Sequence, residues 1–173
     1  MVFTGGMVNV RLQAWSEAPV DVSFDVLRRA NTPEMTSYLG GPESEEKLAD
    51  RQQRYLALTE PGAGRMFVIR ADDEPAGVVG YWEHEWQDEG AYEAGWSVLP
   101  EFQGRGLAVA GLNLVIENAR TFSKHRTLRA FPEIHNGASN AVCRKAGMTL
   151  AGESDFEYPK GNPIRCNDWY IEL

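Results

Sequence analysis

The sequence predicts an α+β (mixed α/β) fold, with a central, mostly antiparallel twisted sheet of about six or seven strands flanked by about four helices. Two observations predict this class. Stretches that alternate apolar and polar residues, typical of half-buried strands, recur along the chain, and stretches with apolar residues at helical spacing separate them. The chain has 173 residues, enough for one domain with a substantial core. We therefore expect residues 1–173 to form a single domain, in which residues 1–6, before Met7, are a dispensable extension.

The first elements are a strand and two helices. Residues 8–15 alternate apolar and polar side chains, as a strand does. Residues 21–30 carry apolar residues at helical spacing and close with two arginines, which suit the last turn of a helix. A Gly-Gly-Pro break then leads to Ser44, a favoured N-cap residue, and two glutamates follow it in the first turn of a helix that runs through Leu58.

Three strands follow in the middle of the chain. Residues 66–71 and 76–86 are rich in apolar and β-branched side chains, and an Asp-Asp-Glu-Pro turn joins them. Residues 91–100 are the third predicted strand, after the polar break at residues 87–90. Short connections join these three strands, which predicts that neighbouring strands are antiparallel.

The period then changes from strand to helix, and shorter elements complete the chain. Residues 127–132 predict a short strand, residues 139–147 a short helix closed by Gly147, and residues 149–158 and 166–173 two final strands. The apolar positions of the long helix before them are Leu107, Ala110, Gly111, Leu114, Val115 and Phe122.

Composition excludes several function classes. The net charge is −8, which argues against nucleic acid as a partner and is compatible with a cationic small molecule or a basic peptide. No apolar run approaches the ~20 residues of a membrane span, so we expect no membrane partner. Cys143 and Cys166 are too few and isolated for a disulfide framework or zinc site, which indicates a reducing cytoplasm and no metal.

Two glycines mark the turn between the third central strand and the long helix. Gly104 and Gly106 permit positive φ and leave room for a ligand beside the free N–H groups of the helix N-terminus. The alternative is an ordinary strand-to-helix turn. The P-loop sequence is absent, and the next glycine, Gly111, comes too late for the dinucleotide fingerprint, so a nucleotide-binding protein is disfavoured.

The segment Gln103-Gly104-Arg105-Gly106-Leu107-Ala108 resembles the Gln/Arg-x-x-Gly-x-Gly/Ala signature of the GNAT superfamily of N-acetyltransferases. Residues 136–153 are similar to a second block of that family, with Met148 in place of the usual Phe. Residues 31–47 resemble the branch that acetylates the N-terminal alanine or serine of ribosomal proteins. The resemblance covers nearly the whole chain in order.

The resemblance implies acetyl-CoA as co-substrate, with its pyrophosphate held by the glycine turn and its pantetheine arm paired with the preceding strand. It implies further that a strand N–H, which we place at Val98, polarises the thioester carbonyl. The residues expected to bind acetyl-CoA are Trp96, Ser97, Val98, Gln103, Gly104, Arg105, Gly106, Leu107, Ala108 and Asn136.

The catalytic residues expected from the resemblance are Glu93 and Ser139. Glu93 would take the proton of the amine, or else only order a neighbouring loop. Ser139 would lie near the CoA sulfur, or act as a helix N-cap. Cys143 occupies the position where many family members have a tyrosine acid, which puts such an acid in doubt. The residues expected on the acceptor side are Tyr38, Glu83 and Glu85, with His84 on the other face of its strand.

The function implied is transfer of the acetyl group of acetyl-CoA to a primary amine, on a protein N-terminus, a polyamine or a small molecule. The alternative is a catalytically weak CoA-binding sensor or interaction module on the same fold. Family members also commonly form homodimers, and the resemblance extends that expectation to this chain.

Overall fold

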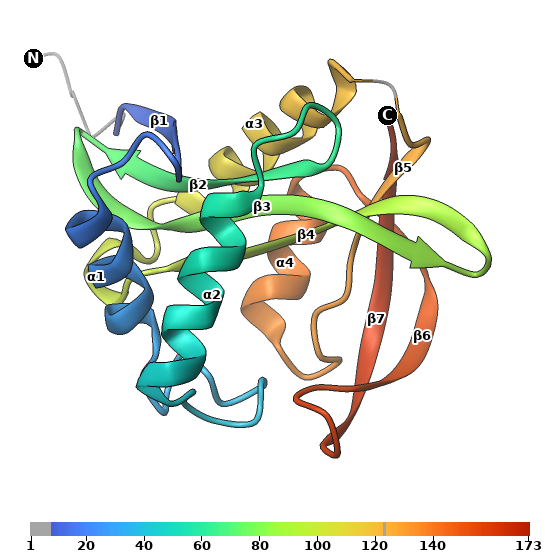
Figure 1. Cartoon of the computed structure of the whole chain (residues 1–173). Coiled ribbons are helices and arrows are strands. Elements are labelled where there is room, and N and C mark those ends of the chain that lie inside the picture. Colours follow the sequence, from blue (N-terminus) through green and yellow to red (C-terminus); the bar gives the residue numbers. More distant parts are fainter. Residues whose placement is uncertain (1–7, 123) are drawn as a thin grey trace, which may run out of the picture.

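The computed structural model describes residues 8–122 and 124–173, through which one seven-stranded sheet runs in the order β1-β2-β3-β4-β5-β7-β6 (Figure 1). This confirms the predicted fold class and element order. Residues 1–6, predicted as an extension, lie outside the described residues. The strands are β1 (Val10–Ala14), β2 (Gly64–Ala71), β3 (Glu74–Trp86), β4 (Glu89–Val98), β5 (Thr127–Ala130), β6 (Thr149–Glu157) and β7 (Pro163–Glu172). The helices are α1 (Val20–Ala30), α2 (Glu45–Ala57), α3 (Leu107–Arg120) and α4 (Gly137–Lys145), with a short 3₁₀ turn, η1 (Pro100–Phe102).

Strands β1 to β4 form an antiparallel meander, and β5, β7 and β6 form a second antiparallel group. The β2–β3 and β3–β4 hairpins turn through Asp72–Asp73 and Gln87–Asp88, all four at positive φ, as tight two-residue loops require. The predicted turns at residues 72–75 and 87–90 had four residues each, so the turns in the structure are two residues shorter. Pro75 belongs to β3, opposite the register shift at Ile69/Arg70, where a missing N–H is tolerated.

The helices cover both faces of the sheet (Figure 1). Residues of α1 and α2 pack with β2 and β3 on one face, around Trp15, Val26, Leu48 and Val68. On the other face, α3 and α4 pack on the sheet around residues such as Ile116. Helix α3 ends at Arg120, so Phe122 lies beyond it and is exposed, contrary to the predicted apolar stripe.

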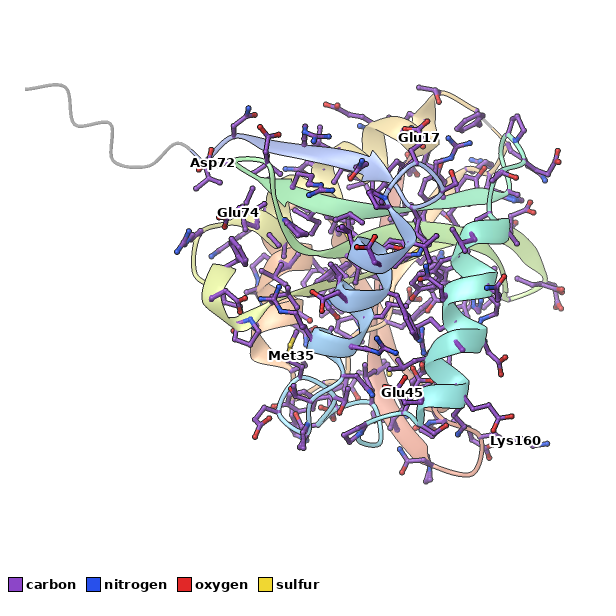
Figure 2. All side chains as sticks on the ribbon, turned by 60° about the vertical axis from the view of Figure 1, so that its left-hand side comes forward. Glu17, Met35, Glu45, Asp72, Glu74 and Lys160 are labelled. Atoms are coloured by element: carbon purple, nitrogen blue, oxygen red, sulfur yellow. The ribbon has the colours of Figure 1, made fainter. Side chains whose placement is uncertain are left out.

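The loop between α1 and α2 lies at the same end of the molecule as the β6–β7 turn (Figures 1 and 2). Met35 of the loop, Glu45 at the start of α2 and Lys160 of the β6–β7 turn are labelled at that end, while Asp72 and Glu74 of the β2–β3 hairpin lie at the other (Figure 2). The predicted N-cap of α2 is confirmed, because Ser44 Oγ accepts a hydrogen bond from the Lys47 N–H at 3.2 Å. None of the helices in the described part of the chain combines the length and apolar character that a membrane crossing demands.

Candidate active site

The two groups of strands meet at a short parallel contact between β4 and β5. Their pairing is confined to Tyr92 with Leu128 and Glu93 with Arg129. Beyond these pairs, β4 continues to Val98 with β3 on one side, so its other edge carries backbone groups that no strand pairs. Such an edge accepts an extended chain bearing amides, because it offers alternate N–H and C=O groups.

The register shows which β4 residues present those groups. The Leu99 N–H donates to the Ala76 carbonyl at 2.8 Å, so Leu99 directs its N–H toward β3. In an antiparallel strand, every second residue directs its N–H and C=O groups to the same neighbouring strand. Trp96 and Val98 therefore direct their backbone groups to the open edge, whereas the Ser97 N–H faces β3. The side chain of Ser97 lines a hollow on the α1/α2 face.

The turn that follows β4 leaves open space at both glycines. Gly104 and Gly106 have φ of +78° and +75°, and a Cβ added to either would meet nothing within 4 Å. The first α3 backbone bond runs from the Ala110 N–H to the Gly106 carbonyl, at 3.0 Å. The N–H groups at the start of α3 therefore have no partner within the helix, and the turn fits an anion such as a pyrophosphate.

The two polar side chains of this turn contact the protein itself. Gln103 Nε2 donates to the Val98 carbonyl at 2.9 Å, which ties the turn to the strand. Arg105 is exposed, and its guanidinium donates to the Glu101 carbonyl at 3.3 Å and lies 5.7 Å from the centre of the Phe102 ring. The open part of the turn is therefore formed by its backbone.

The N-terminus of α4 also contributes to this region. Asn136 is its N-cap, because its side-chain oxygen accepts from the Ser139 N–H at 3.1 Å. The alternative that Ser139 is the N-cap is therefore wrong: Ser139 lies in the first turn, and its hydroxyl makes no hydrogen bond with the described residues. That hydroxyl is free to bond a ligand.

Asn140, which was not among the predicted site residues, holds this helix end in place. Its Nδ2 donates to the carbonyls of Glu133 and Asn136, at 3.0 and 2.8 Å. Its Oδ1 accepts from Asn167 Nδ2 and Trp169 Nε1, both at 2.8 Å. The side chain is buried and joins α4 to β7. In an "NGASN" run, a second Asn reads equally well as a surface or capping residue, so nothing local in the sequence points to this role.

Glu93 lies on the α1/α2 face of β4, and 25% of its side chain is exposed. Trp82 Nε1 donates to Glu93 Oε2 at 3.0 Å, and His84 Nδ1 lies 3.5 Å from the same oxygen. Burial raises the pKa of the Glu93 carboxyl, and the His84 charge and the Trp82 hydrogen bond offset part of that rise. Oε1 accepts no hydrogen bond from the described residues. Glu93 thus has one anchored oxygen and one available to an amine.

Glu83 and Glu85 lie on the opposite face of the sheet from Glu93. Trp82 and His84 contact Glu93, and successive side chains of a strand alternate between faces. Glu83 pairs instead with Lys124 and His125, at 2.6 and 2.9 Å, and these two hydrogen bonds lower the pKa of its carboxyl. The structure therefore does not bring Glu83 and Glu85 together with Glu93.

Aromatic rings continue from Glu93 along the same face. His84 and Trp86 of β3 contact Phe131, with ring centres 5.6 and 4.7 Å apart, and Phe156 of β6 lies 5.5 Å from Trp86. Trp96, by contrast, packs against the core on the α3 side, and Tyr92 is fully buried there. The predicted cluster of central aromatic residues is therefore divided between the two faces.

Tyr38 brings the α1–α2 loop to the start of α4. Its hydroxyl donates to the His135 carbonyl at 3.2 Å, next to Asn136. Tyr38 is 40% exposed, so part of its ring faces solvent beside the N-terminus of α4.

The two cysteines are buried and unpaired. Burial raises the pKa of Cys143 to about 12 and, with the charges of Glu133 and Glu93, that of Cys166 to about 11. Both are therefore thiols at neutral pH, and neither is an activated nucleophile. Within residues 8–122 and 124–173, no three His, Cys, Asp or Glu side chains gather so as to hold a metal ion.

Comparison with known families supplies the assignment. A family model described as an acetyltransferase (GNAT) domain matches residues 9–149. The chain belongs to the GNAT acetyltransferase family. It is an acetyl-CoA-dependent N-acetyltransferase, as the turn signature and the open edge of β4 had indicated. Comparison with curated proteins found no significant match.

Solved GNAT structures share the fold over nearly the whole chain. The Salmonella typhimurium acetyltransferase that modifies the N-terminal serine of ribosomal protein L7/L12 has a TM-score of 0.76 at 23% identity, over 97% of this chain and 96% of that one. The Vibrio fischeri ribosomal-protein-S5-alanine acetyltransferase has a TM-score of 0.75 at 18% identity, over 96% and 93%. The Vibrio cholerae spermidine N-acetyltransferase, in complex with CoA and spermine, has a TM-score of 0.72 at 18% identity, over 94% and 95%. At these identities the likeness confirms the GNAT fold and does not select an acceptor.

Proposed function

We propose that this GNAT enzyme acetylates a primary amine that reaches Glu93 from the α1/α2 face, while acetyl-CoA lies along the open edge of β4. The observation that carries the proposal is the arrangement of β4 itself. Its open edge, at Trp96 and Val98, continues into the glycine turn, and its α1/α2 face carries Glu93. One strand thus serves both substrates.

The proposed acetyl-CoA site follows from the open backbone groups. N–H groups from Gly104 to Ala108 would hold the pyrophosphate, and the backbone groups of Trp96 would pair with a pantetheine amide. Acetyl-CoA supplies an acetyl thioester whose carbonyl oxygen the Val98 N–H would polarise. Asn136 keeps its side-chain Nδ2 without a partner among the described residues, so it can donate to the same arm.

Glu93 is the proposed base. Oε1 would accept a proton from the incoming ammonium, which frees the nitrogen lone pair to form the N–C bond. As the C–S bond breaks, CoA leaves as a thiolate, and the second proton lost by the nitrogen passes to the sulfur to give free CoA. The hydroxyl of Ser139 would donate a hydrogen bond to the departing sulfur. No tyrosine is needed for that role, which is consistent with Cys143 at the usual tyrosine position.

We propose that Tyr38, Trp82 and His84 contact the amine acceptor. The predicted acceptor residues Glu83 and Glu85 are left out of this site. The reason is the strand alternation, which directs the two glutamates away from Glu93. The aromatic rings beside His84 suit an amine with an apolar or aromatic neighbour. Protein N-termini and polyamines, the acceptors of the structural neighbours, are both candidates.

The proposal is tested by incubating the protein with acetyl-CoA and a panel of primary amines, and following thiol release. Amine-dependent release that falls at least 100-fold in Glu93→Gln, with CoA affinity unchanged, supports it. CoA binding by calorimetry with no amine-dependent release would instead support a CoA-binding sensor.

Location and oligomeric state are separate proposals. The two buried, unpaired cysteines suit a reducing cytoplasm. β6 lies at the edge of the sheet and exposes 49% of Leu150, so a homodimer through this edge is proposed. Light scattering after size exclusion tests it, and a monomer mass at micromolar concentration refutes it.

A further inference from the structure

A hollow of ≈100 Å³ lies on the α1/α2 face, beside the β4 residues expected to hold pantetheine. Val78 and Ser97 form part of its lining from the sheet, and Leu27 and Leu48 from the helices. Tyr158, next to the β6–β7 turn, also lines it. The hollow therefore combines apolar walls with a polar end, as small-ligand sites commonly do.

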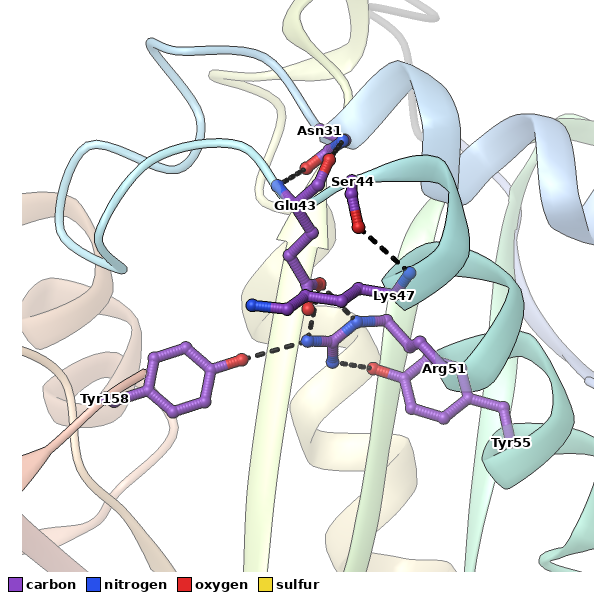
Figure 3. Close-up of polar contacts among 7 residues, drawn as sticks. All are labelled: Asn31, Glu43, Ser44, Lys47, Arg51, Tyr55 and Tyr158. Atoms are coloured by element: carbon purple, nitrogen blue, oxygen red, sulfur yellow. Dashed lines mark hydrogen bonds and ion pairs between the residues drawn. The ribbon is translucent and has the colours of Figure 1, made fainter. Parts of the chain in front are cut away.

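Arg51 is the centre of the polar end (Figure 3). Its Nε and Nη2 both lie 2.7 Å from Glu43 Oε1, its Nη1 donates to the Tyr55 hydroxyl at 3.1 Å, and its Nη2 donates to the Tyr158 hydroxyl at 2.9 Å. Only 20% of the Arg51 side chain is exposed. One guanidinium thereby joins the α1–α2 loop, α2 and the end of β6.

The cluster is held in place before any ligand binds. Asn31 makes two 2.8 Å hydrogen bonds with the backbone of Glu43, one to its carbonyl and one from its N–H (Figure 3). Glu43 in turn fixes the guanidinium of Arg51. A site that is already ordered loses less entropy when it binds a ligand.

Counting donors shows what the cluster offers. A guanidinium has five N–H donors, and the contacts with Glu43, Tyr55 and Tyr158 use four of those of Arg51. Both tyrosine oxygens accept from Arg51, so each O–H is left to donate. Three donors therefore remain for a ligand: one Arg51 N–H and the two tyrosine O–H groups. The only free acceptor in this cluster is the second carboxylate oxygen of Glu43, whose charge balances that of Arg51. The cluster fits an oxygen acceptor better than a second ammonium group.

We propose that Arg51, Tyr55 and Tyr158 select the acceptor by binding a carbonyl or carboxylate oxygen on the carbon next to the reacting amine. The substrate class is then an α-amino acyl compound, either the N-terminus of a peptide or a free amino acid. This inference rests on the proposed function, since it takes the hollow to be the acceptor side of the acetyl-transfer site.

The test compares acetylation of alaninamide and isopropylamine, which differ by the acyl oxygen and its amide. The measured quantity is the ratio of their kcat/KM values in the wild type, Tyr55→Phe and Tyr158→Phe. Each variant removes one hydroxyl and keeps the ring. Tyr170→Phe is the matched control, because Tyr170 lies on β7 with its ring 5.3 Å from the Arg129 guanidinium, and it does not line the hollow.

We expect the wild type to favour alaninamide, and Tyr55→Phe and Tyr158→Phe each to lower the ratio about 5- to 10-fold, the size of one hydrogen bond. Tyr170→Phe should leave the ratio unchanged. Alanine and an alanine-initiated tetrapeptide, added to the panel, distinguish a free amino acid from a peptide N-terminus.

An unchanged ratio in both hollow variants, or a wild type that favours isopropylamine or spermidine, overturns the inference and leaves the proposed function intact. If CoA binds and no amine is acetylated, the proposed function itself fails, and the inference fails with it. A general structural role of the tyrosines would lower kcat/KM for both amines equally, which also overturns the inference.

Discussion

Substituting alanine at Gly106 tests whether the glycine turn holds the CoA pyrophosphate. Gly106 is the N-cap of α3 at φ +75°, and a Cβ there would enter open space. Gly147, just after the C-terminus of a different helix, α4, offers a matched control, because its φ is +85° and a Cβ there would also meet nothing within 4 Å. Both substitutions impose the same strain, about 1 kcal/mol for a left-handed residue that is not glycine.

The two variants should differ only in CoA affinity. A methyl group at Gly106 would occupy the space where a phosphate oxygen is expected to approach the N–H groups. Loss of one hydrogen bond to a charged group costs about 1.5–3 kcal/mol, which weakens CoA binding about 10- to 100-fold. Gly147→Ala should bind CoA as the wild type does.

Isothermal titration calorimetry with CoA gives the two affinities, and thermal unfolding checks that both variants lose a similar, small amount of stability. CoA binding by Gly106→Ala as tight as that of the wild type would refute the assignment of the pyrophosphate to this turn. An equal loss of affinity in Gly147→Ala would also refute the assignment, because the effect would then come from backbone strain alone.

Three further predictions concern the base, α4 and the N-terminal helices. The folded pKa of Glu93 is raised, so the folded state holds this proton more tightly than the unfolded chain. The free energy of unfolding should therefore fall as pH rises from the ordinary carboxyl pKa to the raised pKa of Glu93 in the folded state. The pH at which kcat falls on the acid side should likewise lie above the ordinary carboxyl range. In Glu93→Gln both features should disappear from denaturation and rate profiles, and their persistence would assign them to another group. Asn140→Leu removes four hydrogen bonds and leaves the Trp169 indole N–H buried without an acceptor, so chemical denaturation should show a loss of about 2–4 kcal/mol; a loss under 1 kcal/mol contradicts this role. Gln52 accepts from Trp15 Nε1 and donates to Ser23 Oγ, each at 2.9 Å in the core. Gln52→Leu should cost about 1–3 kcal/mol, whereas Gln53→Leu, on the exposed side of α2, should be nearly neutral, and equal losses would contradict the network.

Elements with strong local signals were predicted correctly from the sequence. The Ser44 cap of α2 and the left-handed Gly147 after α4 depend on residue chemistry within a few positions, and both are confirmed. The glycine turn was predicted for the same reason, because its backbone conformation requires glycine. Alternation along β3 also placed His84 and Glu83 on opposite faces.

Features that depend on tertiary neighbours were not predictable in the same way. Ser139 and Asn136 are both good capping residues, so the local sequence does not decide between them. Asn140 hydrogen-bonds the Glu133 carbonyl and Trp169 of β7, and these contacts hold the start of α4 at Asn136. Arg51 and Tyr158 are 107 positions apart and meet only because α2 and the β6–β7 turn lie at one end of the fold. The alternation of side chains along β3 predicts that Glu83 and Glu85 lie on the opposite face of the sheet from His84. It does not show which face carries Glu93, and only the contacts of His84 and Trp82 with Glu93 do so.

The most direct test of the central claim is mass spectrometry of the products after incubation with acetyl-CoA and a library of peptides with free N-termini, together with spermidine and simple amines. We predict one or more amines heavier by one acetyl group, with free CoA in equal amount, and a product yield that falls at least 100-fold in Glu93→Gln. Tight CoA binding with no acetylated product from any amine, or full activity in Glu93→Gln, would contradict it.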